Sequence, residues 1–158
     1  MLLALLVVAT LFVMFLVKPS KVISEEVAPV PPEIVKLATP QELVLKYAKE
    51  YNVSAPLIKE IINLENREWN EKRQSGIIYK FSDPKRGIVK GEREKSYGLA
   101  QIHLPDHPKI TYEQATSADF AIKFIASEIS QGRGWQWSCY RTAKYNIANG
   151  KSGGECTL

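Results

Sequence analysis

Residues 54–69 constrain the fold most, because they carry the pattern of a helix with one buried face. Ser54 is a typical N-cap residue, and Pro56 fits the first helical turn, where its missing N–H costs nothing. Apolar side chains then recur at helical spacing, at Leu57, Ile58, Ile61 and Ile62. The segment therefore predicts a helix that packs an apolar stripe against a core.

An acidic residue continues this stripe. Three or four residues further along the same face comes Glu65, whereas Lys59 and Glu60 fall on the other side of the helix. Burial without a cation would raise the pKa of the Glu65 carboxyl and keep it protonated near neutral pH, as a general acid requires. The structural alternative is an acid at a helix end that reaches water or pairs with Arg67. Both interpretations fit the periodicity.

Three regions of different composition divide the 158-residue chain. Residues 1–17 form an apolar run, typical of a signal peptide or a short membrane anchor, and residues 18–39 predict a Pro-rich, extended tether. The lack of a basic residue before the run and of a clean cleavage site favours an uncleaved anchor, although Lys18 and Lys21 would by the positive-inside tendency keep that flank cytoplasmic. Residues 40–158 amount to roughly 115–120 residues, the size of one domain. We therefore expect an extracytoplasmic protein, membrane-anchored or secreted, with one folded domain.

The two cysteines form an even count behind the predicted export segment. A disulfide between Cys139 and Cys156 would tie the C-terminal tail to the last helix and could stabilise the fold by about 3 kcal/mol, while two unlinked thiols are the alternative. The formal net charge of +4 suits an anionic partner, such as a cell-wall polymer, a membrane or nucleic acid, but does not choose among them. No nucleic-acid motif stands out, so we expect no nucleic-acid partner.

Further helices and one hairpin follow from local signals. A capping box opens a helix over about residues 39–51, and its inward side chains are Leu43, Val44, Tyr47 and Ala48. Residues 117–131 predict a strongly periodic helix, and about residues 138–148 predict the last one. Residues 76–81 and 88–90 carry the only convincing strand signal, typical of a hairpin with a longer loop. The expected fold class is therefore mainly α, a single helical domain with a small β-hairpin.

The histidines and tryptophans give weaker signals. His103 and His107 are four residues apart, but Pro105 breaks the helical geometry of a metal-binding pair, and no Glu follows His103 as the zinc-peptidase pattern requires. We therefore expect no metal. Trp135 and Trp137 precede the last helix and are either core pillars or platforms for a sugar ring.

Three separated motifs occur in order along the chain: Glu65-Asn66 at the end of an apolar helix, Gly-Leu-Ala-Gln-Ile at residues 98–102, and Ala-Lys-Tyr-Asn-Ile-Ala-Asn-Gly at residues 143–150. Together they resemble motifs of the lysozyme-like lytic transglycosylases, the group of the soluble lytic transglycosylases and goose-type lysozymes. That family has a catalytic Glu usually followed by Ser, a Gly-Leu-Met-Gln-Ile element and an Ala-Tyr-Asn-Ala-Gly segment. The resemblance covers about residues 40–150 and implies a lysozyme-like fold.

The resemblance implies that Glu65 donates a proton to the glycosidic oxygen between N-acetylmuramic acid and N-acetylglucosamine and then acts as base. A substrate hydroxyl attacks within the sugar in this reaction, so the product is an anhydromuramyl sugar, and no second carboxylate, metal or cofactor is needed. The implied partner is the glycan strand of peptidoglycan, cleaved by a monomer that contacts the membrane through its N-terminal segment. Implied substrate contacts fall on later residues: Gln101 with the backbone of Gly98 and Leu99 in the sugar cleft, Tyr145 near the acid, and Asn146 holding the Tyr145 segment.

The chain departs from the family pattern in several places. Asn66 replaces the usual Ser, Ala100 replaces Met, and Lys144 interrupts the third motif. Because the Asn66 amide can donate and accept hydrogen bonds, and so could still contact substrate, we expect an active enzyme.

The stretch between the first two motifs is also longer than in short family members, because it contains the predicted hairpin. This leaves open a two-carboxylate muramidase, a hydrolase whose acids lie about 5–9.5 Å apart across the bond. The candidate second acids are Asp83, Glu92 and Glu94. Outside enzymes, the alternatives are a non-catalytic wall-binding module of the same fold and a plain structural domain.

Overall fold

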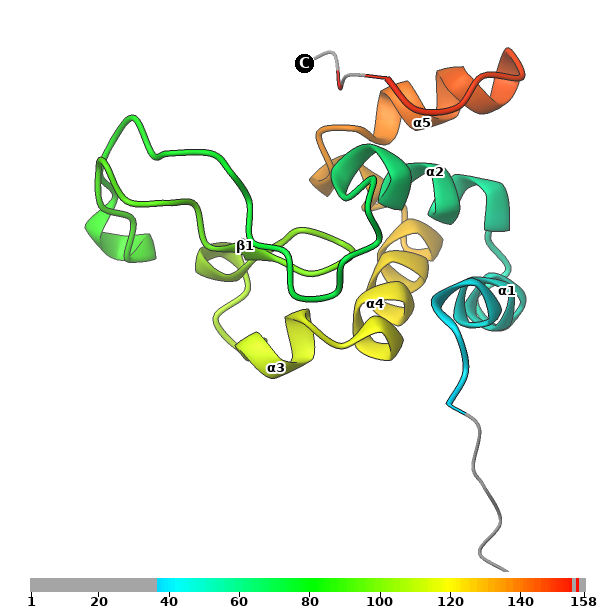
Figure 1. The fold of residues 1–158 in the computed structure, drawn as a ribbon, viewed down its shortest axis with the longest axis horizontal. Helices are drawn as coiled ribbons and strands as arrows, with labels where there is room; N and C mark the ends of the chain where they lie inside the picture. Colours follow the sequence, from blue (N-terminus) through cyan, green and yellow to red (C-terminus); the bar gives the residue numbers. More distant parts are fainter. Residues whose placement is uncertain (1–36, 155, 157–158) are drawn as a thin grey trace, which may run out of the picture. The chain divides into compact units, whose positions relative to one another are not determined.

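The structure is a computed structural model that describes residues 37–154 and 156. The predicted anchor, residues 1–17, and residues 18–36 of the predicted tether lie outside the described residues. Within the described part, the chain forms five α-helices and one two-stranded antiparallel sheet (Figure 1). None of these five helices has the length and apolar character needed to cross a bilayer. The prediction of a mainly helical domain with a small antiparallel hairpin is confirmed at this level.

The first helix, α1 (Pro40–Glu50), begins with the predicted capping box. The backbone N–H of Glu42 donates to the Thr39 hydroxyl over 3.3 Å, and the Glu42 carboxylate accepts from the backbone N–H of Thr39 over 2.7 Å. Two orphan donors of the first turn are thereby satisfied. The four side chains predicted to face inward are buried: Leu43, Val44, Tyr47 and Ala48.

The second helix, α2 (Ala55–Glu65), is the centre of the helical body. Ser54 caps it by accepting from the backbone N–H of Leu57 over 3.3 Å, as predicted. The side chains of Ile58, Ile61 and Ile62 have no solvent exposure, and each such burial contributes about 1.5–3 kcal/mol. This helix packs against α1, α4 (Ala118–Ser130) and α5 (Tyr140–Ala148).

The sequence places Glu60 on the side of this helix away from the apolar stripe, yet this residue is buried. Glu60 is 5% exposed, because the chain that follows α5 returns over α2 and covers this face. Its carboxylate accepts from the Asn146 amide over 2.7 Å, the Gly153 backbone N–H over 2.7 Å and the Ser152 hydroxyl over 2.8 Å. These bonds outweigh the effect of burial, which by itself raises the pKa, and hold the Glu60 pKa below its ordinary value.

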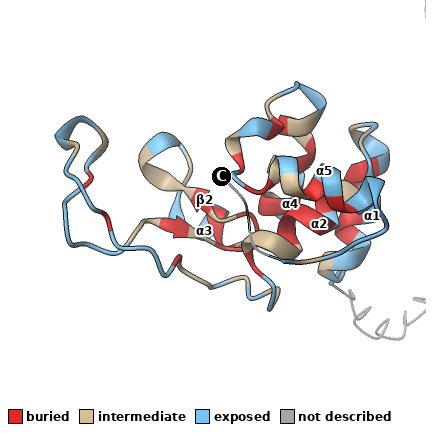
Figure 2. Cartoon of the chain, turned by 90° about the horizontal axis from the view of Figure 1, so that it is seen from above, coloured by how far each residue is buried: buried red, intermediate tan, exposed pale blue. Residues whose placement is uncertain are grey.

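The remaining helices complete one core. Helix α3 (Tyr112–Ala115) is a single turn, and α4 begins at the predicted N-cap Ser117. Gly132, at a φ of +74°, follows the end of α4, and α5 closes the body. Figure 2 shows buried residues concentrated in these helices. The side chains of α4 that have no exposure are Ala121, Ile122, Ile125 and Ala126.

Residues 73–98, here called the ribbon, differ from the predicted hairpin. Residues 76–81 and 88–90 form no regular strands; instead three isolated antiparallel bridges connect Gln74 with Tyr97, Ile78 with Arg93 and Asp83 with Ile88. The regular strands are β1 (Ser96–Tyr97) and β2 (Ile102–His103), on either side of a turn.

The physical reason for this difference lies at the tip of the ribbon. A 3-10 turn over Pro84–Arg86 and two glycines at positive φ, Gly87 and Gly91, interrupt a regular ladder there. Tyr79 and Ile88 are buried, but most of the other apolar side chains of this segment are exposed, and Figure 2 shows the segment mostly exposed. The exposed apolar residues of the ribbon are Ile77, Ile78, Phe81 and Val89.

Candidate active site

A cleft of about 720 Å³ opens where the end of α2 meets the ribbon, strand β2 and the segment before α5. One acidic residue of the helical body, Glu65, lines it. The ribbon contributes most of the opposite wall, including Tyr79 and Glu94, and the segment before α5 contributes Trp137 and Ser138. The cleft therefore collects residues that lie up to about 70 positions apart in the sequence.

Glu65 has the environment of a neutral carboxyl group. It is the last residue of α2, and burial raises its pKa to about 7. The negative charge of Glu94 raises the pKa further, while hydrogen bonds from the Cys139 backbone N–H and the Ser138 side chain lower it. No ion pair to Glu65, with Arg67 or any other cation, occurs in the described part of the chain. The carboxyl can therefore hold or release a proton near neutral pH.

Glu94 is another carboxylate that lines this cleft. Of the three acids named as candidate partners from the sequence, it alone lines the cavity with Glu65. Asp83 instead caps the 3-10 turn by accepting from the Lys85 backbone N–H over 3.1 Å. Glu92 is exposed and pairs with Lys95 over 3.4 Å. The cleft is thus lined by Glu94 and Asp106 as well as by Glu65, whose pKa is strongly raised.

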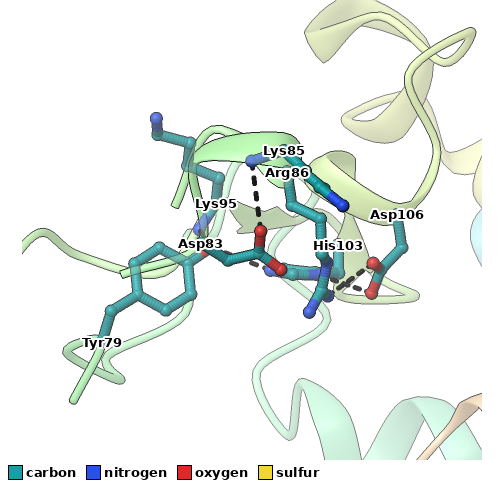
Figure 3. A network of polar contacts seen from close by, with 7 residues as sticks. All are labelled: Tyr79, Asp83, Lys85, Arg86, Lys95, His103 and Asp106. Carbon is teal, nitrogen blue, oxygen red and sulfur yellow. Dashed lines mark hydrogen bonds and ion pairs between the residues drawn. The ribbon is translucent and has the colours of Figure 1, made fainter. Parts of the chain in front are cut away.

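A polar network that the sequence did not predict lies in the wall of the same cleft (Figure 3). The Tyr79 hydroxyl is 2.8 Å from His103 Nε2, and His103 Nδ1 is 2.8 Å from Asp106 Oδ2. Arg86 forms an ion pair with the other oxygen of Asp106, and the Lys95 backbone N–H donates to the Tyr79 hydroxyl over 3.0 Å. The network fastens the ribbon to the segment after β2, so it holds the cleft wall in place.

The same network accounts for His103, whose ring nitrogens contact Tyr79 and Asp106. His107 instead packs edge-on against Phe124, with ring centroids 5.1 Å apart, and burial lowers its pKa. No group of three or more His, Cys, Asp or Glu side chains that could hold a metal ion occurs among residues 37–154 and 156.

A second hollow of about 290 Å³ extends the cleft. The two cavities share lining residues, so they lie side by side, and together they are here called the groove. The two tryptophans have different environments. Trp137 is 7% exposed and donates its Nε1–H to the Ala100 carbonyl over 2.8 Å. Trp135 is 72% exposed and lines the second hollow. Trp137 is a core pillar, and Trp135 presents a free ring face. The shared lining residues are Gln101, His103, Asp106, Gln136 and Trp137.

The Gly-Leu-Ala-Gln-Ile motif forms the turn between β1 and β2. Gln101 lines the cleft, and its Nε2 donates to the Gly98 carbonyl over 2.9 Å. Leu99 has no exposure and belongs to the core. Asn66, also without exposure, donates to the same Gly98 carbonyl over 3.0 Å and to the Asn70 carbonyl over 2.7 Å. In this structure Asn66, Gly98 and Leu99 therefore hold the turn against the end of α2, and Gln101 alone among them lines the cleft.

The third motif does not line the cleft. Tyr145 is 57% exposed, and the Lys151 ammonium lies over its ring at 5.2 Å from the centroid. Asn146 is buried and bridges Glu60 to the Gly153 carbonyl, to which it donates over 2.9 Å. The structure thus places Asn146 in the contact between α2 and the C-terminal tail, and it does not bring Tyr145 together with Glu65 in the cavity.

The segment beside Glu65 carries a disulfide. Cys139 and Cys156 are joined, with their Cα atoms 4.8 Å apart. The C-terminal tail is thereby linked to the residue immediately before α5. Sequence reasoning missed that Ser138 and Cys139 contact the candidate acid, because no motif marks them. Comparison with protein-family models, with curated proteins and with solved structures found no match for the chain.

Proposed function

We propose that this domain is a peptidoglycan lytic transglycosylase of lysozyme-like fold, with Glu65 as its acid and base. The observation that carries the proposal is the Glu65 carboxyl at the wall of an open groove, with a pKa raised to about 7 and no cation paired to it among the described residues. The groove supports a polymeric substrate, because it consists of two adjacent hollows. The exposed ring of Trp135 offers a stacking face for a sugar.

In the proposed reaction Glu65 donates its proton to the glycosidic oxygen, and the bond from that oxygen to the anomeric carbon of N-acetylmuramic acid breaks. A hydroxyl of the same sugar then forms a bond to the anomeric carbon and returns its proton to Glu65, so no water is consumed. Between the two steps Glu65 is a carboxylate. The Cys139 backbone N–H and the Ser138 side chain, which lower the pKa of Glu65, stabilise that charge.

The proposed role of Glu65 predicts a distinctive pH dependence. The acid must be protonated to act, so kcat/KM for fragment release should fall as the pH rises through about 7. An ordinary glutamic acid, with a pKa near 4.3, would lose its proton far earlier. The measurement is the initial rate of release of soluble fragments from purified peptidoglycan between about pH 4 and 9. A decline centred near pH 4 to 5 would contradict the role assigned to Glu65.

A two-carboxylate hydrolase is the second candidate, and the presence of Glu94 in the cleft favours it. Glu94→Gln separates the two. If Glu94 is needed as base or nucleophile, the rate should fall by about 10²-fold or more; in the transglycosylase the variant should still turn over. The pH at which the rate of this variant falls should then be lower than in the wild type, because loss of the Glu94 charge lowers the pKa of Glu65.

The control is Glu92→Gln, which removes a neighbouring carboxylate that lies outside the cleft and pairs with Lys95. This variant should behave like the wild type. Mass analysis of the fragments gives an independent answer, because the anhydro product is lighter than the hydrolysis product by one water.

The proposed setting is extracytoplasmic, with the chain anchored or secreted. The disulfide between Cys139 and Cys156 supports an oxidising compartment. The positive net charge supports an anionic polymer such as peptidoglycan as the partner. A wall-binding module without chemistry would bind glycan strands and release nothing at any pH.

A further inference from the structure

Residues 151–154 and 156, here called the strap, run back along α5 after the helix ends (Figure 1). The Lys151 backbone N–H donates to the Asn146 carbonyl over 2.8 Å, which turns the chain back. Glu60 of α2 then holds the strap by accepting from Ser152 and Gly153. The disulfide to Cys139 fixes its far end. One anchor of the strap is thus non-covalent and on α2, and the other is covalent and at the start of α5.

The start of α5 depends on contacts from outside the helix. Its N-cap residue is Cys139, which makes no side-chain capping hydrogen bond, so the first turn lacks the acceptor that Ser, Thr, Asp or Asn would supply. The Cys139 backbone N–H lies near the Glu65 carboxyl group and lowers its pKa. Ser138 lines the cleft beside that same carboxyl. The residues that contact the candidate acid are therefore the disulfide-bonded residue and its neighbour.

We propose that the strap is a positioning element for Glu65: the disulfide and Glu60 together hold Ser138 and Cys139 against the carboxyl group in the cleft. Its catalytic consequence rests on the proposed function, whereas the positioning itself does not. Cys139 is 1% exposed, so its position is defined by packing and by the covalent link. Opening the disulfide leaves the strap attached through hydrogen bonds to Glu60 and Asn146 and leaves an uncapped first turn free to fray.

The direction of the expected change in the Glu65 pKa follows from the donors at Ser138 and Cys139. Two hydrogen bonds to the ionised carboxyl favour the charged form, so losing them should raise the pKa of Glu65 above about 7. The other ionisable groups that share the cleft belong to the ribbon or to the β2 segment, and no strap residue is among them. Their effect on Glu65 should stay constant when the strap is released. These groups are Arg73, Tyr79, Lys80, Arg86, Glu94, His103 and Asp106.

The test measures the pKa of Glu65 directly, by NMR titration of the full chain in detergent micelles with 13C-labelled glutamate side chains. The samples are the oxidised wild type, the wild type reduced with a phosphine, Cys156→Ser and Ser138→Ala, with Glu65→Gln to assign the signal. We expect the Glu65 pKa to rise by about half a unit or more in the reduced wild type, in Cys156→Ser and in Ser138→Ala. Glu113, an exposed residue of α3 away from the strap, is the internal reference and should titrate unchanged.

An unchanged Glu65 pKa in folded, reduced protein would overturn the proposal. If the samples without the disulfide fail to fold, Glu60→Gln tests the other anchor with the disulfide intact, and it should raise the Glu65 pKa by a smaller amount; no rise in that variant would overturn the proposal equally.

Activity distinguishes the positioning role of the strap from the proposed function of the domain. The pH at which the rate of fragment release falls should rise by the same amount as the pKa of Glu65. A pKa that moves in a chain without any glycan cleavage would refute the proposed function and leave the positioning role standing.

Discussion

Glu65→Gln should abolish the release of soluble fragments from purified peptidoglycan, lowering the rate by about 10²–10⁴-fold. The amide keeps the shape of the protonated acid but cannot transfer a proton to the glycosidic oxygen. The rate is measured beside the wild type at a pH below about 7, where the acid form of Glu65 dominates. Undiminished release by the variant would remove Glu65 from the mechanism.

The same substitution should stabilise the protein above neutral pH. The pKa of Glu65 is raised in the folded state, so ionisation opposes folding: stability is greatest below the unfolded pKa of about 4.5 and falls until the pH passes about 7. Gln carries no charge and avoids this penalty, which amounts to about 3 kcal/mol at pH 8. Denaturant unfolding at pH 5 and pH 8 checks it, and a variant less stable than the wild type at both values would argue against a buried, neutral acid.

Gly98→Ala should destabilise the domain by about 2–5 kcal/mol, the largest stability effect that we expect from a single methyl group. Gly98 lies at a φ of +77°, which strains any residue with a Cβ. A Cβ there would also overlap the backbone oxygen of Ala115 and come within 3.0 Å of its carbonyl carbon. Neither backbone group can move aside easily, because Gly98 is joined to Arg73 and Asn66 by hydrogen bonds.

Two other glycines of the ribbon are matched controls for this prediction. Gly91 has a φ of +88° but open space around a built Cβ, so Gly91→Ala should cost only the strain, about 1–2 kcal/mol. Gly76 has neither feature, and Gly76→Ala should change stability by less than about 0.5 kcal/mol. Urea unfolding midpoints of the three variants give the comparison. Equal effects at Gly98 and Gly76 would show that the turn is not packed as described.

The helices were predictable because their signals are local. The capping box at Thr39, the N-cap Ser54 and the N-cap Ser117 each act within three residues of themselves, and the apolar stripes that follow repeat at the helical period. The candidate acid was predictable for the same reason, since Glu65 continues the stripe of α2. Residues close together in the sequence were sufficient to predict these features.

The features that were missed depend on contacts between distant residues. Glu60 is buried by a tail that lies about 90 residues further along the chain, and helical periodicity contains no information on that tail. The Tyr79–His103 contact spans 24 residues and joins the ribbon to strand β2. The ribbon carries a strand-like composition, but its register depends on a 3-10 turn and on positive-φ glycines at its tip.

The residues named from the sequence motifs also differ in whether they line the cleft. Residues 98–102 lie beside the cleft, but of the positions named there only Gln101 lines it, because Leu99 turns into the core and Gly98 supports the turn. Tyr145 and Asn146 lie at the contacts of α5 with the strap. A motif places a segment near a site, whereas burial decides which of its side chains can reach a ligand.

The most direct measurement of the central claim is the mass spectrum of the soluble fraction after purified peptidoglycan has been incubated with the oxidised full chain. We predict muropeptides that end in an anhydromuramyl sugar, released by the wild type and absent with Glu65→Gln. Fragments with a reducing end would replace the transglycosylase by a hydrolase. A soluble fraction without muropeptides at any pH between about 4 and 9 would contradict the assignment of Glu65 as a glycan-cleaving acid.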